Sequence, residues 1–434
     1  MSTNINITTV SKIDKLNEGI KVIKMELKIN YQYTYFIHPF VVKETKYQRY
    51  MLKMLKDKNC FLKRFEKEKD LKLYQYFSPK MREFLFSSFS FTNAKYAKFE
   101  ELPLETRAGV LAKYPCTIFE YRLENDIQGK TSRENGIFFH IQKIEVICFS
   151  TGICFLCVKT NMEDTQNFAD LLNFNYKFRD IYQGNNSLNN YDNIRIQTDS
   201  FASADSFIEF INKITGSPIE AMKLDIDTER FLTYSYVCID QEAWNHNEQF
   251  ETIEHNFIKY ANILPNDTVA NLKQEDIVSF SKWKYAKMGM TKQGITLMTS
   301  SHDMNNYTIL PEEYENAYLY TYLVALYQKI YLKKLSLEFK EAPKLKKARK
   351  KFVSFSKKIW ISEITEDETG SVLYHKLKEI LELNELYYKV KGEYDIYYKE
   401  LNIEKNKRAT FVIALVLVGS LIFNIMNFIL LSKQ

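Results

Sequence analysis

Glycine and proline are scarce in this chain, which has 12 glycines and 8 prolines among 434 residues. Both residues favour turns and irregular backbone, so their scarcity excludes a low-complexity protein and predicts a chain rich in helices and strands. The sequence also lacks a glycine-rich phosphate loop, an HExxH motif and a GxSxG nucleophile elbow. Because no other catalytic constellation is present either, we predict that the protein is not an enzyme.

Residues typical of metal and redox sites are also few. The six histidines are scattered along the chain. Among six cysteines, Cys154 and Cys157 have the spacing of a zinc or redox pair, but no second pair and no histidine at ligand spacing accompanies them. Because they lie in an apolar, strand-like run, we interpret them as buried free thiols, which suits a reducing cytosol. We therefore expect no metal site and no cofactor.

Charge is absent from one long segment, Ala409 to Leu431, with the sequence ATFVIALVLVGSLIFNIMNFILL. As a helix this segment would extend about 35 Å, whereas the hydrocarbon core of a bilayer is about 30 Å thick. We predict one transmembrane helix at 409–431. The polar N-terminal sequence does not resemble a signal peptide, so insertion is expected to depend on this C-terminal segment.

The charges that flank this segment predict its orientation. Lys405, Lys407 and Arg408 precede it, and Lys433 follows it. The flank with more lysine and arginine stays on the cytoplasmic side. We therefore expect a single-pass protein of the cell inner or plasma membrane with a cytoplasmic N-terminal body.

The predicted membrane helix has one polar face. Ser420, Asn424 and Asn427 are spaced i, i+4 and i+7, so they lie on the same side of a helix. An asparagine that faces lipid would leave its amide without hydrogen-bonding partners. Two interpretations remain open: these residues hydrogen-bond between the helices of an oligomer, or they line a narrow, water-filled pore. Both interpretations require a homo-oligomer.

Hydrophobic patterning divides the rest of the chain into three parts. Residues 1–24 are polar and are predicted to form a loose arm. Residues 25–305 mix segments of period two, typical of strands, with helical segments. This predicts an α/β head within an overall α+β fold. Residues 306–408 are predicted to form a helical stalk that begins near Pro311.

Two features mark the predicted stalk. Lysine and arginine are dense between Lys340 and Lys358, which indicates either a solvated helix face near anionic headgroups or a phosphate-binding surface. From about Glu366 the apolar residues step by three and four, as in a coiled coil, and we find no helix-stopping residue before Leu431. This predicts one continuous helix of about 65 residues, whose apolar seam packs against other subunits. The seam consists of Leu373, Leu377, Ile380, Tyr387, Tyr394, Tyr398 and Leu401.

The order of these parts resembles the CorA-like membrane proteins, especially divergent forms that accompany type III CRISPR and other prokaryotic antiviral systems. The resemblance rests on residues 311–431 and on the runs Phe149–Leu156 and Leu171–Arg179. It implies an oligomer around an axis, with a head that gates the membrane part in response to a nucleotide or oligonucleotide signal. This chain departs from CorA magnesium channels because it has one predicted membrane helix and no Gly-Met-Asn loop there, so no metal-binding residue is carried over.

These observations lead to a functional hypothesis: an oligomeric, ligand-gated pore or ion channel that disrupts membrane integrity in antiphage defence. A signal-binding pocket would need aromatic planes and cations, so Tyr176, Arg179 and Trp283, beside predicted strand ends, are the candidate ligand-binding residues. The candidate pore-lining residues are Ser420, Asn424 and Asn427. The alternative hypothesis is a non-conducting anchored module that recruits a cytosolic partner to the membrane.

Overall fold

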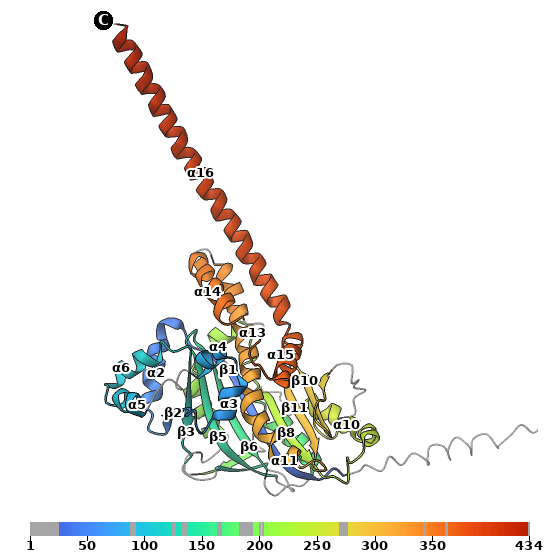
Figure 1. Ribbon diagram of the computed structural model, residues 1–434. Helices are drawn as coiled ribbons and strands as arrows, with labels where there is room; N and C mark the ends of the chain where they lie inside the picture. Colours follow the sequence, from blue (N-terminus) through green and yellow to red (C-terminus); the bar gives the residue numbers. More distant parts are fainter. Residues whose placement is uncertain are drawn as a thin grey trace, which may run out of the picture.

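The computed structural model shows a mixed α/β head followed by a helical part that ends in one very long helix (Figure 1). This arrangement confirms the predicted fold class. The predicted N-terminal arm lies outside the described residues. The structure describes residues 26–86, 93–123, 127–131, 137–162, 167–181, 194–198, 201, 204–268, 277–341, 344–360 and 363–432.

The head is built on a mixed sheet of 11 strands among the described residues. Its main path runs β2-β3-β5-β6-β1-β8-β11-β10-β9, and β4 pairs with β5 and β7. The pairing of β8 with β11 is parallel, and the others are antiparallel. The strands are β1 (Ile29–Val41), β2 (Cys60–Leu62), β3 (Cys116–Tyr121), β4 (Ile127–Thr131), β5 (Phe138–Phe149), β6 (Ile153–Asn161), β7 (Ile194–Gln197), β8 (Leu232–Ile239), β9 (Val278–Phe280), β10 (Ala286–Thr291) and β11 (Gly294–Ser300).

Helices cover both faces of this sheet, so the head has three layers. Hydrophobic side chains on one face pack against α2, α6, α7, α8 and α10. Those on the other face pack against α3, α4 and α13 to α16. The helices are α2 (Tyr47–Lys56), α3 (Leu71–Tyr76), α4 (Pro79–Leu85), α5 (Asn93–Glu100), α6 (Leu104–Leu111), α7 (Phe168–Phe178), α8 (Ala204–Thr215), α9 (Ile219–Met222), α10 (Phe250–Ala261), α11 (Asn305–Thr308), α12 (Leu310–Glu313), α13 (Leu319–Phe339), α14 (Leu345–Lys358), α15 (Glu368–Ile380) and α16 (Leu383–Leu431).

The first long helix of the predicted stalk, α13, packs into the core of the head. The Tyr327 ring stacks on Phe149 of β5 with centroids 4.2 Å apart. Leu323 and Ala325, on different sides of the helix, are also fully buried. One hydrophobic cluster continues from the strands through α13 into α14, α15 and the start of α16. The boundary predicted at residue 306 is therefore a change from mixed strands and helices to helices alone, and the residues on both sides of it share one hydrophobic core.

The predicted continuous helix of about 65 residues is wrong, because the chain turns between α15 and α16. Glu382 has a φ of +55°, which is the left-handed conformation that ends helices. Leu381 and Leu383, on either side of it, are both buried. Tertiary packing fixes this turn without the glycine or proline that would mark it in the sequence.

Packing within the chain also covers the first part of the predicted inter-subunit seam. Leu373 and Leu377 are buried in the core of the head. On α16, the Tyr387 ring stacks on Trp360 at 4.4 Å. Tyr398 is 43% exposed, and beyond it α16 leaves the head. The outer part of the seam is thus the part that remains available to other subunits.

We expect Leu377→Ala to destabilise the head, not to dissociate an oligomer. Its side chain is fully buried, and such truncations cost about 2–5 kcal/mol through lost burial and the cavity that remains. Denaturant unfolding followed by tryptophan fluorescence measures this loss. Ile396→Ala on α16 is the matched control, because its side chain is 61% exposed and should cost less than about 0.5 kcal/mol. Equal costs for the two variants would contradict this packing.

A carboxylate, Glu44, ties α13 and α14 to the sheet layer. It lies 2.9 Å from the Lys334 and Lys347 ammonium groups and 2.5 Å from that of Lys351. Burial alone would raise its pKa, but the charge of Lys334 and the hydrogen bonds from the three lysines outweigh burial and lower the pKa from 4.5 to about 2. A carboxylate with a lowered pKa stabilises the folded state above its unfolded pKa.

We therefore expect Glu44→Gln to lower the free energy of unfolding by about 2 kcal/mol at neutral pH. The deficit should stay constant above pH 4.5 and shrink as pH falls toward 2, where Glu44 in the parent becomes protonated. Denaturant titrations of both proteins across this range measure it. A deficit that is independent of pH would show that Glu44 contributes by packing alone.

Candidate ligand pocket and membrane helix

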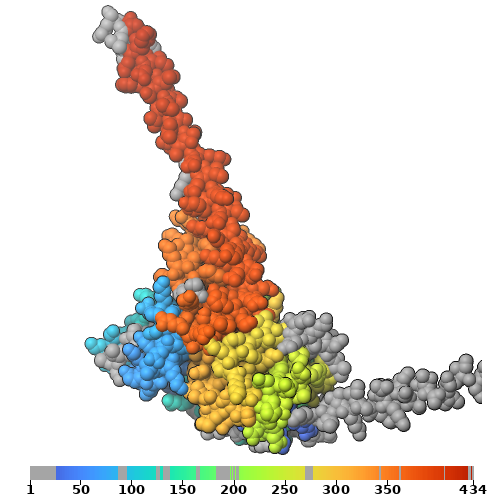
Figure 2. Space-filling model, turned by 45° about the vertical axis from the view of Figure 1, so that its right-hand side comes forward, coloured from blue at the N-terminus to red at the C-terminus, as the bar shows by residue number. Residues whose placement is uncertain are grey.

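The distal part of α16 stands clear of the head (Figure 2). By length and composition, it is the one helix among the described residues that could cross a membrane. Its large apolar side chains between Phe411 and Phe428 are all exposed, each by half or more. Such a surface is not stable in water and requires lipid or other helices around it. The structure thus supports the prediction of a C-terminal membrane helix.

Ser420, Asn424 and Asn427 lie together on one face of this helix, because α16 is continuous through all three. All three are exposed and belong to a stretch that touches no other element of the described chain. No other element of the described chain therefore supplies hydrogen-bonding partners to these three side chains.

A cationic pocket, with a cavity volume of about 310 Å³, lies where β1, α7, α13 and the β10–β11 turn meet. This volume is at the lower end of the range for small-molecule sites, about 300–1,000 Å³. Its apolar walls include Phe231, Leu326 and Ile330. Leu381, at the junction of α15 and α16, also lines it. The pocket thus lies beside the turn at which α16 begins.

Positive charge dominates the lining of this pocket. Four of its five cations have acidic partners: Arg179 and Arg230 lie 4.0 Å and 3.1 Å from Asp180, Lys292 lies 2.7 Å from Glu382, and Lys333 lies 3.1 Å from Asp225. The fifth, Lys329, is more buried than Arg230 and Lys292 and has no acidic partner at ion-pair distance among the described residues. The cations are Arg179, Arg230, Lys292, Lys329 and Lys333, and the acids in the lining are Asp225 and Asp227.

Lys329 is the cation with the least compensation. It makes no hydrogen bond or ion pair with any residue in the described part of the chain. Burial and the charges of Lys333 and Lys292 lower its pKa, and the carboxylates of Glu382 and Asp225 offset only part of this effect. A half-buried lysine held against like charges is costly for the fold, and an anion in the cavity would remove that cost. This arrangement suits a phosphate or carboxylate ligand.

Arg179, a residue predicted from the sequence, lies in this pocket at the C-terminal end of α7. Its Nη1 donates to Gln293 Oε1 at 2.5 Å, and its guanidinium lies 4.9 Å from the Tyr176 ring centroid. Its Nε has no hydrogen-bond partner among the described residues and lies 4.0 Å from Asp180 Oδ1. The structure thus brings Arg179 and Tyr176 together, with Arg179 as the group that reaches the cavity.

Trp283, the third predicted ligand-binding residue, is not part of this pocket. Its ring packs on Phe280 at 5.5 Å and on Tyr318 at 5.7 Å, beside the start of α13. Tyr318 precedes Lys329 by eleven residues of helix, or about 16 Å. In this structure Trp283 therefore covers the core, in agreement with its position among the residues that pack against it.

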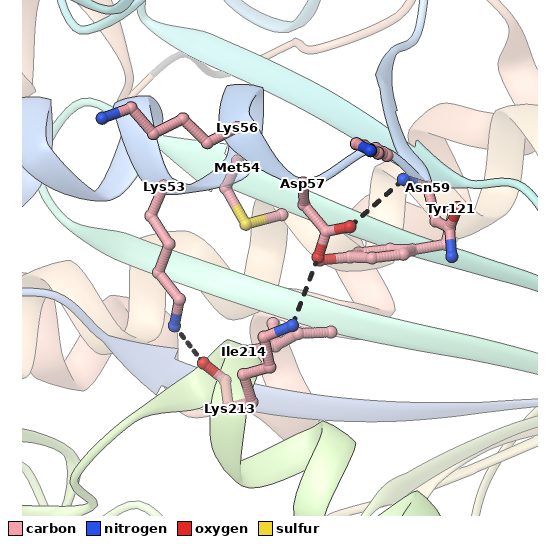
Figure 3. Close-up of a pocket in the computed structure, with 9 residues that line it drawn as sticks. Lys53, Met54, Lys56, Asp57, Asn59, Tyr121, Lys213 and Ile214 are labelled. Atoms are coloured by element: carbon pink, nitrogen blue, oxygen red, sulfur yellow. Dashed lines mark hydrogen bonds and ion pairs between the residues drawn. The ribbon is translucent and has the colours of Figure 1, made fainter. Parts of the chain in front are cut away.

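A second, larger cleft of about 480 Å³ lies between α2 and α8 and contains four lysines (Figure 3). Lys53 donates to the Lys213 carbonyl, and the Lys213 ammonium lies 3.6 Å from Asp57. Both helices end at this cleft, so their negative dipole ends face it and the lysines compensate them. Two of these lysines thus already have partners within the cleft, whereas Lys329 has no ion pair among the described residues, which makes the cationic pocket the better candidate for a ligand site.

The described residues also bear on metal and redox chemistry. Cys154 and Cys157 are both buried, and they pack into the hydrophobic cores on opposite faces of the sheet. They cannot form a common site, which agrees with their interpretation as free thiols. Groups of acidic, histidine or cysteine residues that could hold a metal ion are absent from the described ranges.

Comparison with known proteins gives no further assignment, because no protein family, curated protein or solved structure matches this chain.

Proposed function

We propose that this protein is an oligomeric, ligand-gated pore of antiphage defence, anchored in the cell inner membrane with its head in the cytoplasm. The cationic pocket binds an anionic, nucleotide-type signal, and α16 from several subunits forms the conducting part. The orientation follows from Lys405, Lys407 and Arg408 on the head side of the apolar segment. The role in defence follows from the resemblance to CorA-like effectors.

The observation that carries the proposal is the polar face of α16. One helix cannot satisfy Ser420, Asn424 and Asn427 in a bilayer, and the head offers them no partner within the described chain. A ring of helices turns these residues toward a common axis. There, amides and hydroxyls contact one another or water.

The cationic pocket is positioned to influence the ring of α16 helices. Leu381 lines the pocket, and two residues later α16 begins. The first turns of α16 are fixed to the head, because Leu383 and Val390 are fully buried. A change of pocket shape is therefore transmitted to the membrane by tilting head and helix together as a rigid body, and not by a hinge within the stalk.

Reconstitution of the full-length protein tests this function. Vesicles with a potassium gradient and a potential-sensitive dye are prepared with the protein, and ATP and a short oligoadenylate serve as anionic nucleotide probes on the head side. We expect depolarisation that depends on a probe. Binding of a probe without any conductance would support the anchored module that recruits a partner, and conductance without any probe would remove the pocket from the mechanism.

A further inference from the structure

The hairpin between α13 and α14 ends in a basic tip, which we define as Lys340, Lys344, Lys346, Lys347 and Lys350. All five are exposed. Lys344 pairs with Glu341 at 2.6 Å, and Lys347 pairs with Glu44 at 2.9 Å. The side chains of the other three have no hydrogen bond or ion pair with any residue that the structure describes. The tip therefore presents positive charge that the chain itself does not neutralise.

This tip points along α16 toward the membrane segment. α14 runs beside α16, and three contacts set the register: Trp360 on Tyr387 at 4.4 Å, Phe352 on Tyr394 at 5.1 Å and Arg349 over Tyr398 at 5.4 Å. The two helices are therefore antiparallel, and the N-terminal end of α14 lies nearest to the membrane segment of α16. Figure 1 shows α14 at the end of the head from which α16 emerges.

The register places the tip close to the bilayer surface. From Tyr398 to Ala409, where the uncharged segment begins, α16 rises about 16 Å, and Lys346 lies about 5 Å beyond Arg349 in the same direction. Measured along α16, Lys346 therefore lies about 11 Å from the level of Ala409. This distance includes the headgroup layer, which is about 5–7 Å thick. An extended lysine side chain of about 6 Å spans the rest. The ammonium groups therefore reach the phosphates within a Debye length, about 8–10 Å.

We propose that the basic tip binds anionic lipid headgroups of the leaflet that faces the head, and so fixes the height and tilt of the head over the membrane. The proposal rests on the membrane topology stated above and not on conduction. Each lysine near an anionic surface strengthens association about fivefold. Lys340 at the end of α13, with Lys346 and Lys350 in the first turns of α14, forms a surface that fits phosphatidylglycerol or another anionic lipid.

Hydrogen exchange in nanodiscs tests the proposal with the full-length protein. The first turn of α14 is the reporter, because its amides have no acceptor within the helix. In discs that contain phosphatidylglycerol, we expect these amides to exchange on the order of tenfold more slowly than in pure phosphatidylcholine discs. The difference should vanish in about 1 M salt, where the Debye length is about 3 Å.

The variant Lys340→Gln/Lys346→Gln/Lys350→Gln should lose the lipid dependence. The matched control, Lys98→Gln/Lys113→Gln/Lys284→Gln, removes the same charge from exposed lysines on the head and should keep it. Co-elution of each protein with its discs confirms insertion independently. Equal exchange in the two lipids, or a lipid dependence that survives in the first variant, would overturn the proposal. Equal protection by inorganic phosphate in phosphatidylcholine discs would show that the tip binds free anions and not lipid.

Discussion

Lys329→Met is expected to weaken binding of an anionic nucleotide about 10- to 100-fold without destabilising the head. The affinity loss follows because charge-assisted hydrogen bonds contribute about 1.5–3 kcal/mol each. The fold should tolerate the change because the Lys329 side chain has no ion pair or hydrogen bond among the described residues, and because burial and the charges of Lys333 and Lys292 outweigh the attraction of Glu382 and Asp225. Methionine keeps most of the apolar stem that packs beside Leu326 and Ile330 in the pocket wall.

Titration calorimetry with ATP and thermal unfolding of the same samples separate these two effects. Lys113→Met is the control, since Lys113 is exposed and does not line the pocket. We expect the control to bind like the parent and the pocket variant to be as stable as the parent, or more so. Unchanged affinity in Lys329→Met would exclude the pocket as the anion site. Reduced affinity with a parallel loss of stability would indicate a structural role for Lys329.

The fold was predictable wherever a local pattern determines the structure. The hairpin of β5 and β6 follows from two strand-like runs on either side of Gly152. The φ of this residue is +84°, a conformation that glycine adopts readily because it has no side chain. The helical character of α13 was equally clear from its period. The burial of α13 on all sides could not be predicted from this period, because it depends on strands and helices that are far away in the sequence. The turn at Glu382 is a further case, since packing of its leucine neighbours selects a conformation that glutamate rarely adopts.

The candidate site was predictable only in part. Arg179 was selected because a signal pocket needs cations, and it does line the cavity. The other residues that line the cavity lie as far away in the chain as Pro39 and Leu381, and no spacing rule links them to Arg179. One signal was present in the sequence: Lys329 is the first charge in a helix that begins with ten uncharged residues. A lysine in so apolar a helix needs either a partner or a ligand.

Asn424→Leu/Asn427→Leu is expected to abolish conductance while leaving membrane insertion and oligomer mass unchanged. Leucine branches at Cγ as asparagine does, has the same number of side-chain heavy atoms and is more hydrophobic, so the helix should insert at least as well. Both residues lie on the face with Ser420, and an apolar ring at this level closes a narrow pore by excluding water. The dye assay in vesicles and the light-scattering mass in detergent measure the two properties on the same preparation.

The matched control for this variant is Ile422→Leu/Met426→Leu, on the opposite side of α16 at 3.6 residues per turn. It should conduct like the parent. If the asparagines only join helices, the first variant should instead lose oligomer stability, on the order of 1 kcal/mol for each hydrogen bond, before conductance is affected. A variant that assembles and conducts like the parent would reject both roles. The polar face would then have to be satisfied by a different membrane partner, because the chain itself supplies none among its described residues.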